Sequence, residues 1–131
     1  MIESMMTFEE ACKEYEKKTN TEKLLQLIRE NPDLPVVPMV NEEVVADDSH
    51  SWWLANFGMC SIDSYYSDEK HERVWLKADD EEDLLDMWAD EHYEELKNLS
   101  NEEAEKVVNT RGKEWFENLP WVKAIMVYIE L

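Results

Sequence analysis

The chain has 131 residues, of which 44% are hydrophobic, and its 32 acidic and 13 basic residues give a formal net charge of −19. This length and apolar content predict a single folded domain over residues 1–131 and argue against a disordered chain. The charge argues against direct binding to nucleic acid or to an anionic membrane, and it favours basic protein surfaces as partners.

The first predicted helix begins at Thr7, which forms a T-x-x-E capping box with Glu10. Four residues are expected on its inner face: Phe8, Ala11, Cys12 and Tyr15. The polar run at residues 17–21 is expected to interrupt the pattern. A second helix is then predicted over about residues 22–30, and the Asn-Pro pair at residues 31–32 ends it.

The middle of the chain changes to strand patterns. Residues 34–40 are apolar and β-branched but contain two prolines, which predicts an edge strand. A short strand is expected over residues 43–46. Residues 52–66 are rich in aromatic and β-branched side chains and predict a longer strand, with a bend at residues 56–58. Residues 72–78 return as a further strand of an antiparallel meander.

The segment at residues 79–99 carries ten carboxylates and one base, and it predicts an amphipathic helix on the outside of the fold. Its apolar side is formed by Leu84, Leu85, Trp88, Ala89, His92 and Leu96. An unbroken i, i+4 row of carboxylates lies opposite: Glu82, Asp86, Asp90 and Glu94. Asp79 is expected to cap the helix, with Glu82 in capping-box spacing and Asp83 beside the row.

This acidic face has three interpretations. Like charges at i, i+4 cost a helix about 0.2–0.5 kcal/mol per pair, and an ordinary solvated helix alternates Glu with Lys, which this one does not do. The simplest interpretation is a solvated face of an acidic protein. The second is a mimic of the DNA phosphate backbone, which carries one charge per ~1.7 Å of duplex. The third is binding of a hard cation such as calcium, although no D-x-D-x-D-G loop is present.

The last third of the chain predicts one more helix and one more strand. Ser100 opens an S-x-x-E box with Glu103, and the helix is expected to run to about Glu117. Residues 121–131 are mostly apolar at both their odd and their even positions, so both faces of a strand formed here would be apolar. This pattern is typical of an interior strand. The predicted fold class is therefore α+β: a four- to five-stranded, mainly antiparallel sheet with about four helices packed on it.

The sequence offers little catalytic chemistry. It contains no H-E-x-x-H, G-x-S-x-G, P-loop or G-x-G-x-x-G motif, and no cofactor is predicted. His92 is expected to be a core or rim histidine, and Cys12 and Cys60 to be reduced core thiols. One alternative, a metal-dependent hydrolase, rests on Asp47, Asp48, His50, Asp68 and His71.

Paired aromatic residues suggest a second kind of binding surface. Neighbouring residues of a strand face opposite ways, so one member of Trp52–Trp53 and one of Tyr65–Tyr66 faces outward unless helices cover both faces of the sheet. Exposed aromatics beside acidic residues are typical of protein–protein hot spots.

Three stretches carry a resemblance to a known group of proteins: LIRENPDLPVVPMVNEEVV at residues 27–45, WLANFGMCSIDSYY at residues 53–66 and KAIMVYIEL at residues 123–131. In these stretches the chain resembles small acidic proteins encoded by phages and mobile elements of low-GC Gram-positive bacteria. The resemblance covers most of the chain, and the acidic helix is its most variable part. It implies an anti-restriction or anti-CRISPR context in the cytoplasm of a bacterial host cell, and it transfers no catalytic residue.

The leading prediction is a non-enzymatic binding protein that offers carboxylates to the basic cleft of a nuclease or another nucleic-acid-binding protein. The predicted partner-binding residues are Asp79, Glu82, Asp83, Asp86, Asp90, Glu91, Glu94 and Glu95, with Trp52 and Trp53. The alternative is a protein–protein interaction module of a mobile element, with a homodimer as one of its forms, that uses the Trp52–Trp53 pair and the Tyr65–Tyr66 edge. No metal is predicted in either case.

Overall fold

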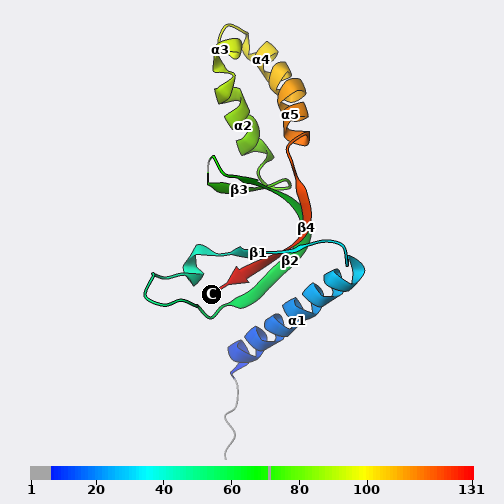
Figure 1. The fold of residues 1–131 in the computed structure, drawn as a ribbon, viewed down its shortest axis with the longest axis vertical. Coiled ribbons are helices and arrows are strands. Elements are labelled where there is room, and N and C mark those ends of the chain that lie inside the picture. The colour runs from blue at the N-terminus through cyan, green and yellow to red at the C-terminus, as the bar shows by residue number, and fades with distance from the viewer. Residues whose placement is uncertain (1–6, 71) are drawn as a thin grey trace, which may run out of the picture. The chain divides into compact units, whose positions relative to one another are not determined.

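The structure is a computed structural model that describes residues 7–70 and 72–131 (Figure 1). In chain order its elements are α1 (Phe8–Glu30), β1 (Val36–Val40), the 3-10 helix η1 (Glu42–Val44), β2 (Asn56–Asp68), β3 (Arg73–Leu76), α2 (Glu81–Glu91), α3 (Tyr93–Leu96), α4 (Asn101–Val107), the π-helix η2 (Val108–Gly112), α5 (Lys113–Glu117) and β4 (Val122–Glu130). The four strands form one mixed sheet, and the predicted α+β class is confirmed.

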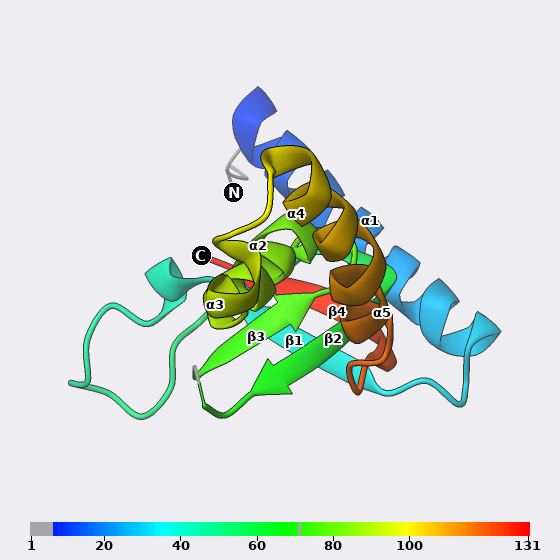
Figure 2. The same cartoon turned by 90° about the horizontal axis from the view of Figure 1, so that it is seen from above.

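The sheet has the strand order β1-β4-β2-β3. β1 runs parallel to β4, with Val36 opposite Ile125, whereas β2 runs antiparallel to β3 (Figure 2), with Tyr65 opposite Leu76. The proline-containing strand β1 therefore lies at an edge, as predicted. β4 is an interior strand, as its apolar pattern predicted, and its residues 124–127 are buried.

The chain forms two compact units, each with its own hydrophobic cluster. The first comprises the residues up to Ile62 together with Ala124–Leu131, and its cluster consists of Leu24, Cys60, Ile125 and Val127. The second comprises Asp63–Lys123, and its cluster consists of Trp75, Leu84 and Phe116. The assignment of residues 1–131 to a single domain stays a prediction.

α1 is one continuous helix, so the predicted interruption at residues 17–21 is wrong. The hydroxyl of Thr19 donates to the carbonyl of Tyr15 at 2.8 Å, and that of Thr21 donates to the carbonyl of Lys17 at 2.9 Å. Back-bonding of this kind lets threonine sit inside a helix. The capping box at Thr7 is confirmed, and Asn31 ends the helix.

The predicted inner face of α1 is also wrong. Phe8 is 87% exposed and Tyr15 is 72% exposed, and Ala11 and Cys12 are exposed as well. α1 reaches the first cluster through Leu24, which lies in its C-terminal half. Cys12 is therefore not a core thiol. Cys60 is a buried free thiol, and burial raises its pKa.

Residues 42–44 form η1 instead of the strand predicted over residues 43–46. The Asn41 side chain accepts a hydrogen bond from the backbone N–H of Glu43 at 2.9 Å. This cap turns the backbone into a helical conformation directly after β1, which is the physical reason for the difference.

The second unit contains the remaining helices. Ser100 caps α4 by accepting a hydrogen bond from the N–H of Glu103 at 3.2 Å, as its S-x-x-E spacing predicted. α4, η2 and α5 then follow one another without a gap to Glu117. This agrees with the predicted helix except for the π-helical turn at its centre.

Candidate functional site

The acidic segment is held in place by its apolar side. Leu84 is fully buried in α2 and packs with Trp75 and Phe116, and Trp88 is 4% exposed one turn later. Gly112 in η2 lies close to α2, where an added Cβ would meet a side-chain carbon of Trp88 at 3.3 Å. A residue without a side chain therefore lets η2 approach α2, and this contact fixes the position of the acidic face.

The start of the acidic helix differs from the prediction. Asp80, not Asp79, is the N-cap residue of α2, and its side chain makes no capping hydrogen bond to the helix. Its carboxylate instead accepts a hydrogen bond from the backbone N–H of Leu76 at 2.7 Å. Asp80 therefore ties the end of β3 to the start of α2.

The carboxylate side of the segment is exposed to solvent. All eight predicted carboxylates are classed as exposed: Asp79, Glu82, Asp83, Asp86, Asp90, Glu91, Glu94 and Glu95. The row is not carried by one helix, however, because the segment divides into α2 and α3 at His92. Glu82, Asp86 and Asp90 share α2 at a rise of about 6 Å per four residues, and Glu94 belongs to α3.

Three of these carboxylates have a basic partner. Arg73 lies 3.8 Å from the carboxylate of Asp83, Arg111 lies 2.8 Å from that of Glu95, and Lys97 pairs with Glu94. The other five make no ion pair with residues 7–70 or 72–131: Asp79, Glu82, Asp86, Asp90 and Glu91. The uncompensated charge therefore lies on α2 and just before it.

A groove runs beside this uncompensated row. It encloses about 610 Å³, and Ala78, Asp79, Glu81, Glu82, Leu85, Asp86, Glu105, Val108 and Asn109 line it. Five of the nine side chains are carboxylates. One of them, Glu105, comes from α4, and its sequence position does not indicate that it lies here, because only the packing of the helices brings it there. Such a groove suits a long cationic side chain, whose aliphatic stem would lie against Leu85 and Val108.

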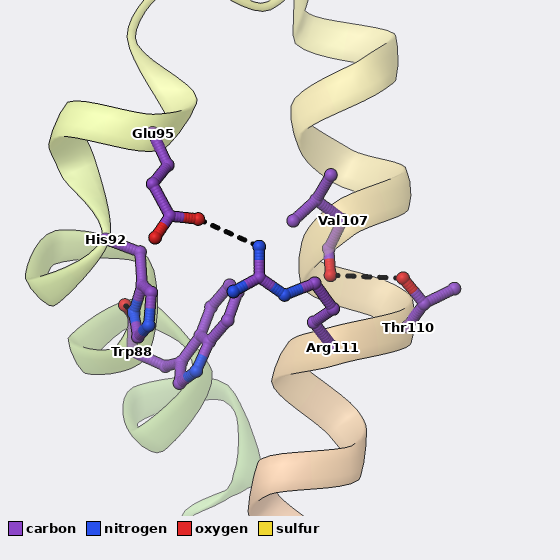
Figure 3. A network of polar contacts seen from close by, with 6 residues as sticks. All are labelled: Trp88, His92, Glu95, Val107, Thr110 and Arg111. Atoms are coloured by element: carbon purple, nitrogen blue, oxygen red, sulfur yellow. Dashed lines mark hydrogen bonds and ion pairs between the residues drawn. The ribbon is translucent and has the colours of Figure 1, made fainter.

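At the junction of α2 and α3, a polar network joins these helices to η2 (Figure 3). The Arg111 guanidinium lies 5.6 Å from the centre of the Trp88 ring and bonds to the Glu95 carboxylate, and this bond lowers the pKa of Glu95. The His92 ring stacks on Trp88 with centres 4.1 Å apart. His92 Nδ1 lies 2.8 Å from the Trp88 carbonyl, to which it donates because a carbonyl can only accept. His92 is therefore a half-buried rim residue, as predicted.

Those residues of the metal alternative that the structure describes do not gather into a cluster. Within the described parts of the chain there is no group of three or more His, Cys, Asp and Glu side chains that could hold a metal ion. Asp47 accepts a hydrogen bond from the N–H of Ser49 at 2.8 Å, and its pKa is lowered by hydrogen bonds from Ser49. His50 packs edge-on against Trp53 with ring centres 5.3 Å apart, and His71 lies outside the described residues.

The two aromatic pairs behave differently. Trp52 is 90% exposed in the segment between η1 and β2, and Leu54 beside it is 94% exposed, whereas Trp53 is half-buried. Tyr65 and Tyr66 lie on the interior strand β2, in register with Leu76 and Trp75 of β3, so they do not form an edge of the sheet, and both side chains are half-buried. Of the two pairs, Trp52 is the member that is largely exposed.

Comparisons with known proteins add no relative. No protein-family model, no curated protein and no solved structure matches the chain. Among the helices described, none is both long and apolar enough to cross a membrane.

Proposed function

We propose that this protein is a non-enzymatic DNA mimic that inhibits a nucleic-acid-binding defence enzyme, such as a CRISPR effector or a restriction enzyme, in the cytoplasm of a bacterial host. The observation that carries the proposal is the row of Glu82, Asp86 and Asp90 on α2, which is exposed and has no basic partner within the described chain.

The carboxylates of this row repel one another, and the helix is stable in spite of that repulsion. Each i, i+4 carboxylate pair costs about 0.2–0.5 kcal/mol, and a single lysine in the row would remove that cost. The helix tolerates the repulsion because Leu84 and Trp88 anchor its other side in the second unit. A row of charges that is kept uncompensated on a well-anchored helix supports a binding role.

The geometry suits a cleft that binds DNA. Carboxylates about 6 Å apart along a helix present negative charge to lysine and arginine side chains that otherwise neutralise phosphates. Such a protein competes with DNA for the same cleft. Electrostatic steering speeds the encounter, and added salt weakens the complex.

The test begins with a pull-down from a host lysate and continues with a DNA-displacement assay on the recovered enzyme. The double variant Asp86→Lys/Asp90→Lys is expected to lose displacement. The matched control Glu42→Lys/Glu43→Lys, which makes the same change in charge on exposed residues of η1, is expected to retain it. Normal displacement by the α2 variant would exclude this surface as the site.

A second candidate function is supported by the exposure of Trp52 and Leu54. Tryptophan is enriched among protein–protein hot spots, and two large apolar side chains that are almost fully exposed favour a protein interaction module. The variant Trp52→Ser/Leu54→Ser separates the two candidates. Under this second function it abolishes partner capture at both low and high salt, and under DNA mimicry it leaves the salt-sensitive capture in place.

A further inference from the structure

We infer that the N-terminal half of α1 is a self-association surface, and that its partner is the same helix of a second copy of this chain. Four exposed side chains form the surface, which we call the α1 stripe: Phe8, Ala11, Cys12 and Tyr15. Their spacing at i, i+3, i+4 and i+7 places them on one side of the helix. This inference is independent of the proposed function.

The α1 stripe is distinct from the face that packs on the sheet. Leu24 and Leu27 contact the first cluster, and the Asn20 side chain donates a hydrogen bond to the carbonyl of Phe57 at 3.0 Å. At ~100° per residue, these residues lie about a third of a turn away from the stripe. Because α1 is unbroken, as Figure 1 shows, both faces belong to one rigid helix.

The exposure of the α1 stripe is unusual for a solvated helix. Phe8 is 87% exposed and Tyr15 is 72% exposed, one on each side of the two small residues at the centre of the stripe. Isolated apolar side chains on a surface need no explanation, but two aromatic residues aligned along one helix face are the anchors of helix–helix recognition.

Charge identifies the partner. α1 has six acidic and five basic residues and a net charge of −1, so the rest of the chain carries −18. Two copies therefore repel one another over most of their surface but approach with little repulsion through α1. The charged side chains beside the stripe already pair with one another within the helix. Lys13 lies 3.9 Å from Glu9, and Lys17 lies 3.5 Å from Glu14. A strongly basic partner gains little from such a surface, whereas a second α1 fits it.

The size of the α1 stripe predicts a weak complex. Stable interfaces bury about 1,600 Å² in total, and four side chains on about two helical turns cover less than that. We therefore expect association that depends on concentration. Salt should strengthen it by screening the repulsion between two chains of −19 each. Binding of a basic partner has the opposite salt dependence, so the two effects are separable.

Symmetry places Cys12 where it can report on the pairing. In a two-fold pair the same patch is used by both copies, so residues at the middle of the α1 stripe come close to their own counterparts. Cys12 lies near that middle and is exposed, and Cys60 is 1% exposed in the first cluster. A maleimide reagent therefore has one accessible thiol per chain.

Sedimentation of the full chain over a wide range of concentration, at low and high salt, tests the inference. The wild type is expected to form a dimer that salt strengthens, and Phe8→Ser/Tyr15→Ser is expected to weaken that dimer by about tenfold or more. The matched control is Val45→Ser/Leu131→Ser, which removes two exposed apolar side chains elsewhere in the first unit and is expected to change nothing. Circular dichroism checks that α1 stays helical.

Crosslinking gives a second measurement. A short bis-maleimide is expected to link two wild-type chains and two Cys60→Ala chains but not two Cys12→Ser chains. A chain that stays monomeric at every concentration and salt overturns the inference. So does a dimer that tolerates Phe8→Ser/Tyr15→Ser, or one that is lost in the Val45→Ser/Leu131→Ser variant, because the contact then lies elsewhere.

Discussion

Arg111 reaches from η2 to α3 and holds the Glu95 carboxylate at 2.8 Å, while its guanidinium also lies over the Trp88 ring. The Arg111 side chain therefore compensates one carboxylate near the end of the acidic segment and also covers the ring of a core tryptophan. Together with Lys97, which pairs with Glu94, it compensates the carboxylates of α3, whereas Glu82, Asp86 and Asp90 on α2 have no basic partner among the described residues.

The pKa of Glu95 gives the first prediction. In Arg111→Gln the pKa of Glu95, measured by NMR titration, is expected to rise toward the usual range for a glutamate. Because the folded-state pKa is lowered, the pair stabilises the fold above the usual pKa and loses that effect as pH falls through the lowered value. The variant's stability should therefore depend less on pH in the acid range. An unchanged pKa of Glu95 would contradict the assignment of Arg111 as its cause.

The second prediction concerns the stability that the carboxylate row costs the helix. Asp86→Lys removes two repulsions, with Glu82 and with Asp90, and creates attractive pairs in their place. We expect the free energy of unfolding, measured with urea, to increase by about 0.8–2 kcal/mol, because each of the two pairs changes from repulsion to attraction. Asp83→Lys is the control, because Asp83 has an ion pair with Arg73, and it is expected to give no increase. A destabilised Asp86→Lys would show that the row costs the helix nothing.

The third prediction concerns the anchor of the acidic helix. Leu84 is fully buried against Trp75 and Phe116, so Leu84→Ala is expected to lower the free energy of unfolding by about 2–5 kcal/mol. Leu54→Ala makes the same chemical change at a side chain that is 94% exposed, and it should change stability by less than about 0.5 kcal/mol. Equal effects of the two substitutions would contradict this placement of α2.

The fourth prediction concerns β4. Removal of residues 126–131 takes away the buried Met126 and Val127 and leaves most of β1 without a strand to pair with. We expect the truncated chain to be unfolded by circular dichroism and NMR. Removal of Leu131 alone, which is 71% exposed, should leave the fold intact. A folded truncated chain would mean that β4 is dispensable.

Local signals were predictable from the sequence. Thr7 and Ser100 begin helices because each side chain accepts a hydrogen bond from a backbone N–H three residues later, and both partners lie within one turn. The edge position of β1 followed from its prolines, and the interior position of β4 followed from its continuous apolar run.

The errors arose where tertiary packing decides between local alternatives. α1 carries two apolar stripes, and its sequence does not indicate which of them meets the sheet, so Phe8 and Tyr15 were assigned to the wrong side. The row of acidic residues was predicted from spacing alone. The division at His92 and the contribution of Glu105 to the groove depend on how α2, α4 and η2 pack together.

The position of β4 in the sheet has a consequence for synthesis on the ribosome. β1 lies at the edge beside β4, and nearly all of the second unit is translated between these two strands. A nascent chain therefore holds β1 unpaired until β4 has emerged, so the first unit completes its sheet late. The proline ring at Pro38 removes one N–H from this waiting strand, which limits its pairing with neighbouring chains in the interval.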